Sequence, residues 1–123
     1  MRRLQEPEDL RKRTKAYSLR IIRMYGSLPN TTVAQVIGRQ VLRSGTSPGA
    51  HYREACRSRS TAEFISKVEG GLQELEETVY WLELLIESDT VPRHLLEPLL
   101  EETNELIAIF TASAITAKKR KRP

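Results

Sequence analysis

The sequence predicts an all-α fold, an up-down-up-down bundle of four helices that assembles into an oligomer. Clusters of proline and glycine divide the 123 residues into four segments, and apolar residues recur every three or four positions in each. No segment shows the two-residue alternation that is typical of strands. Short links between long amphipathic helices favour antiparallel neighbours. We expect helices over about residues 8–27, 31–56, 60–88 and 92–118.

The first helix is predicted from a heptad pattern. Its core positions are separated alternately by four and three residues: Leu10, Thr14, Tyr17, Ile21, Met24 and Leu28. The pattern stops at Pro29, because a proline inside a helix removes a backbone donor and clashes with the preceding turn.

The second helix begins after Asn30 or Thr31, since both residue types cap helix N-termini. Its expected core stripe is unusually small and polar: Val33, Ile37, Gln40, Ser44, Pro48, His51 and Ala55. The stretch 44–50 is poor helix-forming material, and Pro48 removes one backbone donor. The helix either continues through Pro48 with a kink or breaks there.

The third helix has the most regular pattern, with core positions Ile65, Val68, Leu72, Leu75, Val79, Leu82 and Ile86. Ser60 followed by Glu63 predicts a capping box at its start. Each glycine of the pair Gly70-Gly71 costs about 1 kcal/mol relative to alanine. Close packing of a neighbouring element would compensate for this cost.

The fourth helix is predicted from apolar residues at Leu96, Leu99, Leu100, Leu106, Ile107, Phe110, Ala114 and Ala117. Pro98 is tolerable near the first turn. We expect a flexible basic N-terminus over residues 1–7, the bundle over residues 8–118, and a basic tail over residues 119–123.

Composition points to a cytoplasmic protein that does not enter membranes. The single cysteine, Cys56, cannot form an internal disulfide, which favours a reducing compartment. The N-terminal residues mix cations and acids where a signal peptide would be apolar. No uncharged apolar run approaches the roughly 18 to 20 residues needed to span a bilayer.

Charge is strongly segregated along the chain. Residues 1–25 carry a net charge of +5 and residues 26–60 one of +4, whereas residues 61–110 have twelve acids against two cations. The last thirteen residues restore +5. Such segregation predicts a basic face for polyanions, or opposed faces that attract subunits to one another.

An apolar surplus predicts a homo-oligomer. Some large apolar side chains lie off the core stripes of the first and third helices, and one bundle cannot bury them all: Leu19, Ile22, Tyr80, Trp81 and Leu84. A second apolar stripe of this kind usually marks an interface between subunits.

The main candidate binding site is one face of the second helix, which carries in order Arg39, Arg43, Thr46, Ala50, Arg53 and Arg57. Arginine presents a flat fork suited to phosphate, and the small residues between the two pairs let a backbone approach. Pairing of these arginines with acids of the third and fourth helices, within or between subunits, is the alternative.

Further cationic candidates lie on the first helix and near the C-terminus: Arg11, Lys12, Lys15, Arg23, Lys118, Lys119 and Arg120. Phosphate binding by these residues would depend on salt and hardly on base sequence. Solvated helix faces and a solubilising tail are the alternative.

No catalytic residue, metal site or cofactor is predicted. His51 is expected to be a packed polar residue, because no second histidine, cysteine or carboxylate stands at metal-ligand spacing. Cys56 lacks a histidine partner for nucleophilic catalysis. Since nucleophile-elbow and phosphate-loop motifs are also missing, we expect a protein that is not an enzyme.

Residues 43–55, RSGTSPGAHYREA, resemble the SGTSxGANYxEA signature of the four-helix proteins named after intervening sequences in bacterial 23S ribosomal RNA genes. Residues 64–67 and 77–85 resemble the third helix of that family, and residues 106–118 its closing helix. The likeness covers roughly residues 15–118. His51 stands where the family more often has asparagine, and Gly70-Gly71 departs from its alanine-rich pattern.

The resemblance implies a left-handed four-helix bundle, commonly assembled as a ring-shaped homopentamer, without known enzymatic activity. More distantly similar bundles are accessory subunits of diversity-generating retroelements, in which a basic pentamer binds nucleic acid and the reverse transcriptase.

Two functions are therefore expected. One is a non-enzymatic oligomeric accessory protein that binds RNA or DNA through the first two helices. The other is an interaction scaffold or reverse-transcriptase accessory subunit, whose arginines form intersubunit or partner salt bridges.

Overall fold

A computed structural model describes the backbone of residues 7–121 and the side chains of residues 9–120. Within this range every regular element is a helix: α1 (Pro7–Gly26), α2 (Thr32–Cys56), α3 (Thr61–Glu87) and α4 (Arg93–Lys121). The prediction of an all-α four-helix fold is confirmed. The predicted flexible N-terminus, apart from the Pro7 backbone, and residues 122–123 of the predicted tail lie outside the described residues.

The helix ends differ from the predicted ones by at most one residue, except at the end of α4. This helix continues to Lys121, so Lys119 and Arg120 extend it and do not start a separate tail at residue 119. Alanine, lysine and arginine are good helix formers, and cations are stabilised at the negative end of the helix dipole. Both effects favour the longer helix.

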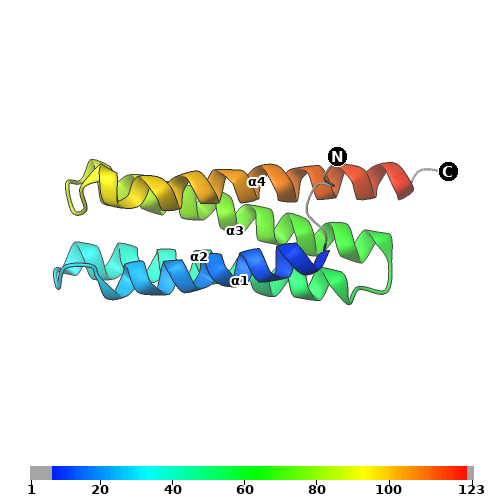
Figure 1. The fold of residues 1–123 in the computed structure, drawn as a ribbon, viewed down its shortest axis with the longest axis horizontal. Coiled ribbons are helices and arrows are strands. Elements are labelled where there is room, and N and C mark those ends of the chain that lie inside the picture. The colour runs from blue at the N-terminus through cyan, green and yellow to red at the C-terminus, as the bar shows by residue number, and fades with distance from the viewer. Residues whose placement is uncertain (1–6, 122–123) are drawn as a thin grey trace.

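The four helices lie side by side along one axis, and successive helices run in opposite directions (Figure 1). α1 packs against α2, α2 against α3 and α3 against α4, whereas α1 and α4 approach each other at few points. The connections 27–31 and 88–92 lie at one end of the bundle. The connection 57–60 lies at the other end, which we call the α2–α3 turn end.

The core runs the length of the bundle and receives side chains from all four helices. The largest fully buried apolar side chains are Leu10, Tyr17, Ile21, Val41, Val68, Leu75, Leu82, Leu85, Leu96, Leu106 and Phe110. Val33, expected in the core, is exposed, and its neighbour Ala34 is buried in its place. Gly70-Gly71 has the expected compensation, since a Cβ at Gly71 would lie 2.6 Å from Cε2 of Phe110.

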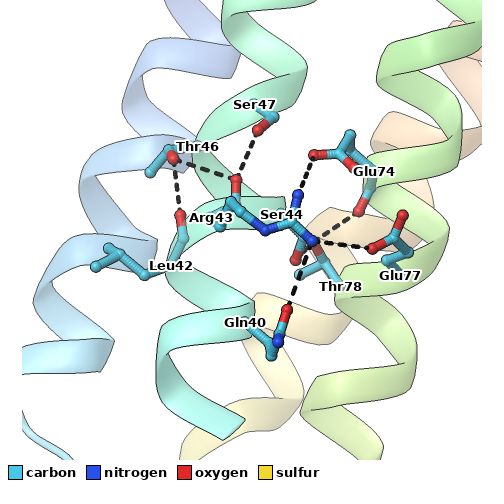
Figure 2. A network of polar contacts seen from close by, with 9 residues as sticks. All are labelled: Gln40, Leu42, Arg43, Ser44, Thr46, Ser47, Glu74, Glu77 and Thr78. Carbon is cyan, nitrogen blue, oxygen red and sulfur yellow. Dashed lines mark hydrogen bonds and ion pairs between the residues drawn. The ribbon is translucent and has the colours of Figure 1, made fainter. Parts of the chain in front are cut away.

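Helix α2 is continuous through Pro48. It begins with Thr31 as N-cap, whose Oγ1 accepts a hydrogen bond from the Ala34 amide. In the turn before the proline, the hydroxyls of Thr46 and Ser47 donate to the carbonyls of Leu42 and Arg43 over 2.7 Å each (Figure 2). Pro48 has no N–H to donate to the Ser44 carbonyl, and these two hydroxyl bonds go to the carbonyls of the two preceding residues.

Glycines of α2 set its close approach to α1. A Cβ at Gly45 would lie 2.7 Å from Cδ1 of Ile21, which is too close for two carbon atoms. A Cβ at Gly49 would lie 3.3 Å from Oγ1 of Thr14. Larger residues would push the two helices apart. The run of small residues over 44–50 in α2 is therefore explained by its packing against α1.

A layer of buried hydroxyls crosses the core, with one hydroxyl from each helix. The hydroxyl of Tyr17 lies 2.7 Å from Oγ1 of Thr103, and Oγ of Ser44 lies 2.8 Å from Oγ1 of Thr78. All four side chains are buried. Burial raises the pKa of Tyr17 to about 12, while its contacts with Thr103 and Thr78 act in the opposite direction.

Candidate nucleic-acid interface

A cationic groove lies between α1 and α2 near the α2–α3 turn end. It has a volume of about 430 Å³ and is lined by Arg11, Lys12, Lys15, Arg53 and Arg57. Arg11 and Lys15 are four residues apart on α1, so they share one face, and the same spacing joins Arg53 to Arg57. The close approach of the helices at Gly49 brings these two faces together.

The groove brings positively charged side chains together, and most of these side chains have no carboxylate partner among the described residues. Within the described part of the chain, Arg11 and Lys15 form no ion pair, and neither do Arg53 and Arg57. Below the groove lies the buried Tyr52, whose pKa is raised by burial and lowered in part by the charge of Arg11. The groove therefore presents a concentrated positive potential to solvent.

Arg43 lies on the same predicted stripe of α2 but points towards α3 (Figure 2). Its Nη1 is 3.8 Å from Glu74 Oε2 and its Nη2 is 3.6 Å from Glu77 Oε1. Nη2 also donates to the Gln40 Oε1 over 3.5 Å. For Arg43, the contacts match the alternative reading of interhelical pairing, although 62% of the side chain stays exposed.

Arg13, which was not among the predicted site residues, ties α1 to α4. Its Nε and Nη2 donate to the two carboxylate oxygens of Glu102 over 2.8 and 2.7 Å, and Nη2 also donates to Glu105 over 2.7 Å. Hydrogen bonding to Glu102 raises the pKa of Arg13 further above its ordinary value. Arg13 stands three residues after the core residue Leu10 and so lies on the same side of α1. This spacing was the one sign in the sequence that Arg13 faces another helix.

The remaining predicted cations do not gather in the groove. Arg23 lines an open pocket with Arg20 and Leu95, between α1 and α4. Arg39 is exposed on α2. Lys118 pairs with Glu69 of α3 over 2.7 Å, and Lys119 is exposed.

A second pocket opens at the α2–α3 turn end. It measures about 400 Å³ and is lined by Ser58, Arg59, Ser60, Thr61, Phe64 and Arg120. Among the predicted binding residues only Arg120 lies there. Arg59 was missed because it follows the end of the predicted second helix, where helical spacing no longer applies.

The predicted interface residues divide into two groups. Leu19, Ile22 and Tyr80 are exposed, whereas Trp81 and Leu84 are half-buried. Among residues 9–120, the other exposed large apolar side chains are Val33, Val36, Leu95 and Ile115. Apart from Ile115, the exposed ones lie in the helix halves next to the connections 27–31 and 88–92. Apolar surface and cationic groove therefore lie towards opposite ends of the bundle.

His51 lies half-buried between α2 and α3. Its Nδ1 is 4.0 Å from Glu54 Oε1, and Glu54 also pairs with Lys67 over 3.2 Å. Across residues 9–120, no three histidine, cysteine or acidic side chains are placed to hold a metal ion. No helix in the described range is long and apolar enough to cross a bilayer.

The fold and the groove define a class: a small four-helix protein with one concentrated cationic groove. Residues 8–112 match the family model of the 23S rRNA-intervening sequence proteins. The chain belongs to this family. It is also similar to the crystal structure of a Bacteroides thetaiotaomicron protein with unknown function from the S23 ribosomal protein family, with a TM-score of 0.83 and 34% identity. That similarity covers 89% of this chain and 98% of the other. No curated protein matches the chain.

Proposed function

We propose that this protein is a non-enzymatic, oligomeric accessory protein that binds RNA or DNA through the groove between α1 and α2. The observation that supports it is the juxtaposition of Arg11, Lys12 and Lys15 with Arg53 and Arg57 along one open groove. Guanidinium and ammonium groups at a groove bind the phosphates of a nucleic-acid backbone and release its condensed counterions. Binding of this kind depends strongly on salt and weakly on base sequence.

The oligomer is part of the same proposal. Exposed apolar side chains such as Ile22, Tyr80 and Leu95 supply a surface for contacts between subunits away from the groove. The family resemblance supports a left-handed up-down-up-down bundle in a homopentamer. A ring of subunits would repeat the groove and raise the affinity for a long strand through multivalency. The composition supports a cytoplasmic location.

Two variants with equal net charge test the groove. The first replaces groove cations (Arg11→Gln, Arg53→Gln, Arg57→Gln), and the second replaces three cations outside it (Arg20→Gln, Arg23→Gln, Arg39→Gln). Binding to a fluorescent single-stranded RNA and to its DNA counterpart is measured by anisotropy at about 50 mM salt, where phosphate contacts are strong. We expect the groove variant to lose on the order of tenfold or more in affinity and the control to change little.

Equal losses in both variants would show that only total charge matters, and absence of binding by the wild type would reject the proposal. If the groove variant instead changed the oligomer, as measured by light scattering, the groove arginines would form intersubunit salt bridges. That outcome would favour the interaction scaffold or the reverse-transcriptase accessory subunit. The pairing of Arg43 with Glu74 and Glu77 is the contact that most resembles such a role.

A further inference from the structure

The pocket at the α2–α3 turn end begins one residue along the chain from the cationic groove. Arg57 is the last groove residue along the chain, and the next residue, Ser58, lines the pocket. Arg59 and Arg120 add two guanidinium groups, and neither forms an ion pair with a described carboxylate. Arg59 and Arg120 therefore bring further cations to the same end of the bundle as the groove.

The pocket differs from the groove because it contains an aromatic side chain. Phe64 is half-buried: part of it packs against the core, and part lines the pocket. Core packing holds the ring in place, which lowers the entropy that stacking would cost. Arginine guanidinium planes also stack on bases, so Arg59 and Arg120 can act on a base as well as on a phosphate.

Two of the three hydroxyl residues in the pocket are already engaged. Ser58 Oγ donates to the Ala55 carbonyl over 2.7 Å, and Ser60 Oγ accepts from the Glu63 amide over 3.1 Å. These bonds hold the turn in shape and leave Phe64, the two arginines and the Thr61 hydroxyl to contact a ligand. The pocket thus offers an aromatic ring and positive charge, but few groups that could read a base edge.

We propose that this pocket takes an unpaired base of a single-stranded nucleic acid, stacked on Phe64 and flanked by Arg59 and Arg120. The inference rests on the proposed function and specifies its substrate class. In a duplex the bases are stacked on one another and paired, so their faces cannot reach a side chain on the protein surface. Phosphate contacts in the groove serve both forms, whereas the pocket favours the single strand. Base stacking is tolerant of sequence, so no strong base preference is expected.

The test compares three probes on the wild-type chain and on Phe64→Leu. The probes are an oligonucleotide of about 12 nucleotides in uridine RNA or thymidine DNA, the same strand with abasic sites, and the corresponding duplex. We expect the wild type to bind the single strand about 5- to 100-fold more tightly than the abasic strand. Phe64→Leu should lose this difference and bind the duplex as the wild type does. Phe64→Trp, which keeps an aromatic face, should retain it.

Equal wild-type binding of the normal and abasic strands overturns the base pocket, and this measurement does not depend on how any variant folds. If it occurs while the groove variant still loses affinity, the proposed function stands without the pocket. If no strand binds at about 50 mM salt, the proposed function itself fails. Retention of the full difference by Phe64→Leu would also overturn the assignment to this ring.

Discussion

At Gly45 the lack of a side chain determines how closely α1 packs on α2. An added Cβ would lie 2.7 Å from both Cδ1 and Cγ1 of Ile21, which is fully buried and β-branched and therefore cannot move aside easily. Overpacking of this kind costs about 1–3 kcal/mol, whereas replacing a helical glycine by alanine gains about 1 kcal/mol. The steric cost outweighs the gain in helix propensity.

We therefore expect Gly45→Ala to lower the free energy of unfolding by up to about 2 kcal/mol, as measured by urea denaturation. Gly26→Ala is the matched control, because a Cβ at that helix end meets no atom within 4 Å. The control should be neutral or slightly stabilising. Equal stability of the two variants would contradict the explanation that the small residues over 44–50 are needed for the close packing of α2 on α1.

Individual arginines show which parts of the site could be predicted. Helical spacing placed Arg43, Arg53 and Arg57 on one exposed face of α2, and all three are exposed there. Spacing could not show that Glu74 and Glu77 of α3 stand within reach of Arg43. That depends on the axial register of two helices far apart in the sequence. The sequence therefore could not show that, among residues 9–120, Arg43 is paired with acids while Arg53 and Arg57 on the same face of α2 are not.

At the scale of the helices, the hydroxyl layer couples all four elements at one level of the bundle. A slip of one helix along its axis would separate Tyr17 from Thr103, or Ser44 from Thr78, and would leave buried hydroxyls without these partners. We infer that the layer helps to set the helix register, as buried polar residues do in coiled coils. The heptad pattern predicted Tyr17 in the core but not its partner on α4.

The raised pKa of Tyr17 makes this layer sensitive to high pH. The neutral phenol is favoured in the folded chain, whereas in the unfolded chain the side chain ionises near its ordinary pKa of about 10. The unfolded state therefore binds fewer protons between about pH 10 and pH 12, and stability falls as pH rises through this window. The expected loss from this residue is about 2 kcal/mol by pH 12.

Denaturation of the wild type and Tyr17→Phe at about pH 9 and pH 11 checks this expectation. The phenylalanine variant should lose less stability between the two values, although it retains the decline that Tyr52 contributes through its own raised pKa. Tyr80→Phe, which changes an exposed ring, should behave as the wild type. An equal decline in all three proteins would contradict the burial of an ionisable phenol at position 17.

The helix boundaries were predictable because caps and prolines act locally. Ser60 accepts from the Glu63 amide and Thr31 from the Ala34 amide, so both starts are determined by residues within one turn. The continuity of α2 through Pro48 was not predictable from propensity. It is supported by the close packing of Gly45 and Gly49 against α1, which requires the folded chain.

Across the whole molecule, the cationic groove and most of the exposed apolar surface are separated along the bundle axis. Groove cations and the pocket with Phe64 lie towards the α2–α3 turn end, and most exposed apolar side chains lie towards the connections 27–31 and 88–92. This separation lets subunits associate through one part of the surface while another stays open to a polyanion. The charge blocks of the sequence predicted a basic face, and the antiparallel packing of α1 and α2 explains where it lies.

The central claim is that groove cations contact nucleic-acid phosphates, and the salt dependence of binding tests it most directly. For a single strand, five phosphate contacts predict a slope of log K against log salt concentration of about −3.5. Replacing Arg11, Arg53 and Arg57 by glutamine should make the slope shallower by about 2, whereas the variant at Arg20, Arg23 and Arg39 should keep the wild-type slope. A wild-type slope near zero, or the same slope in all three proteins, would contradict the account.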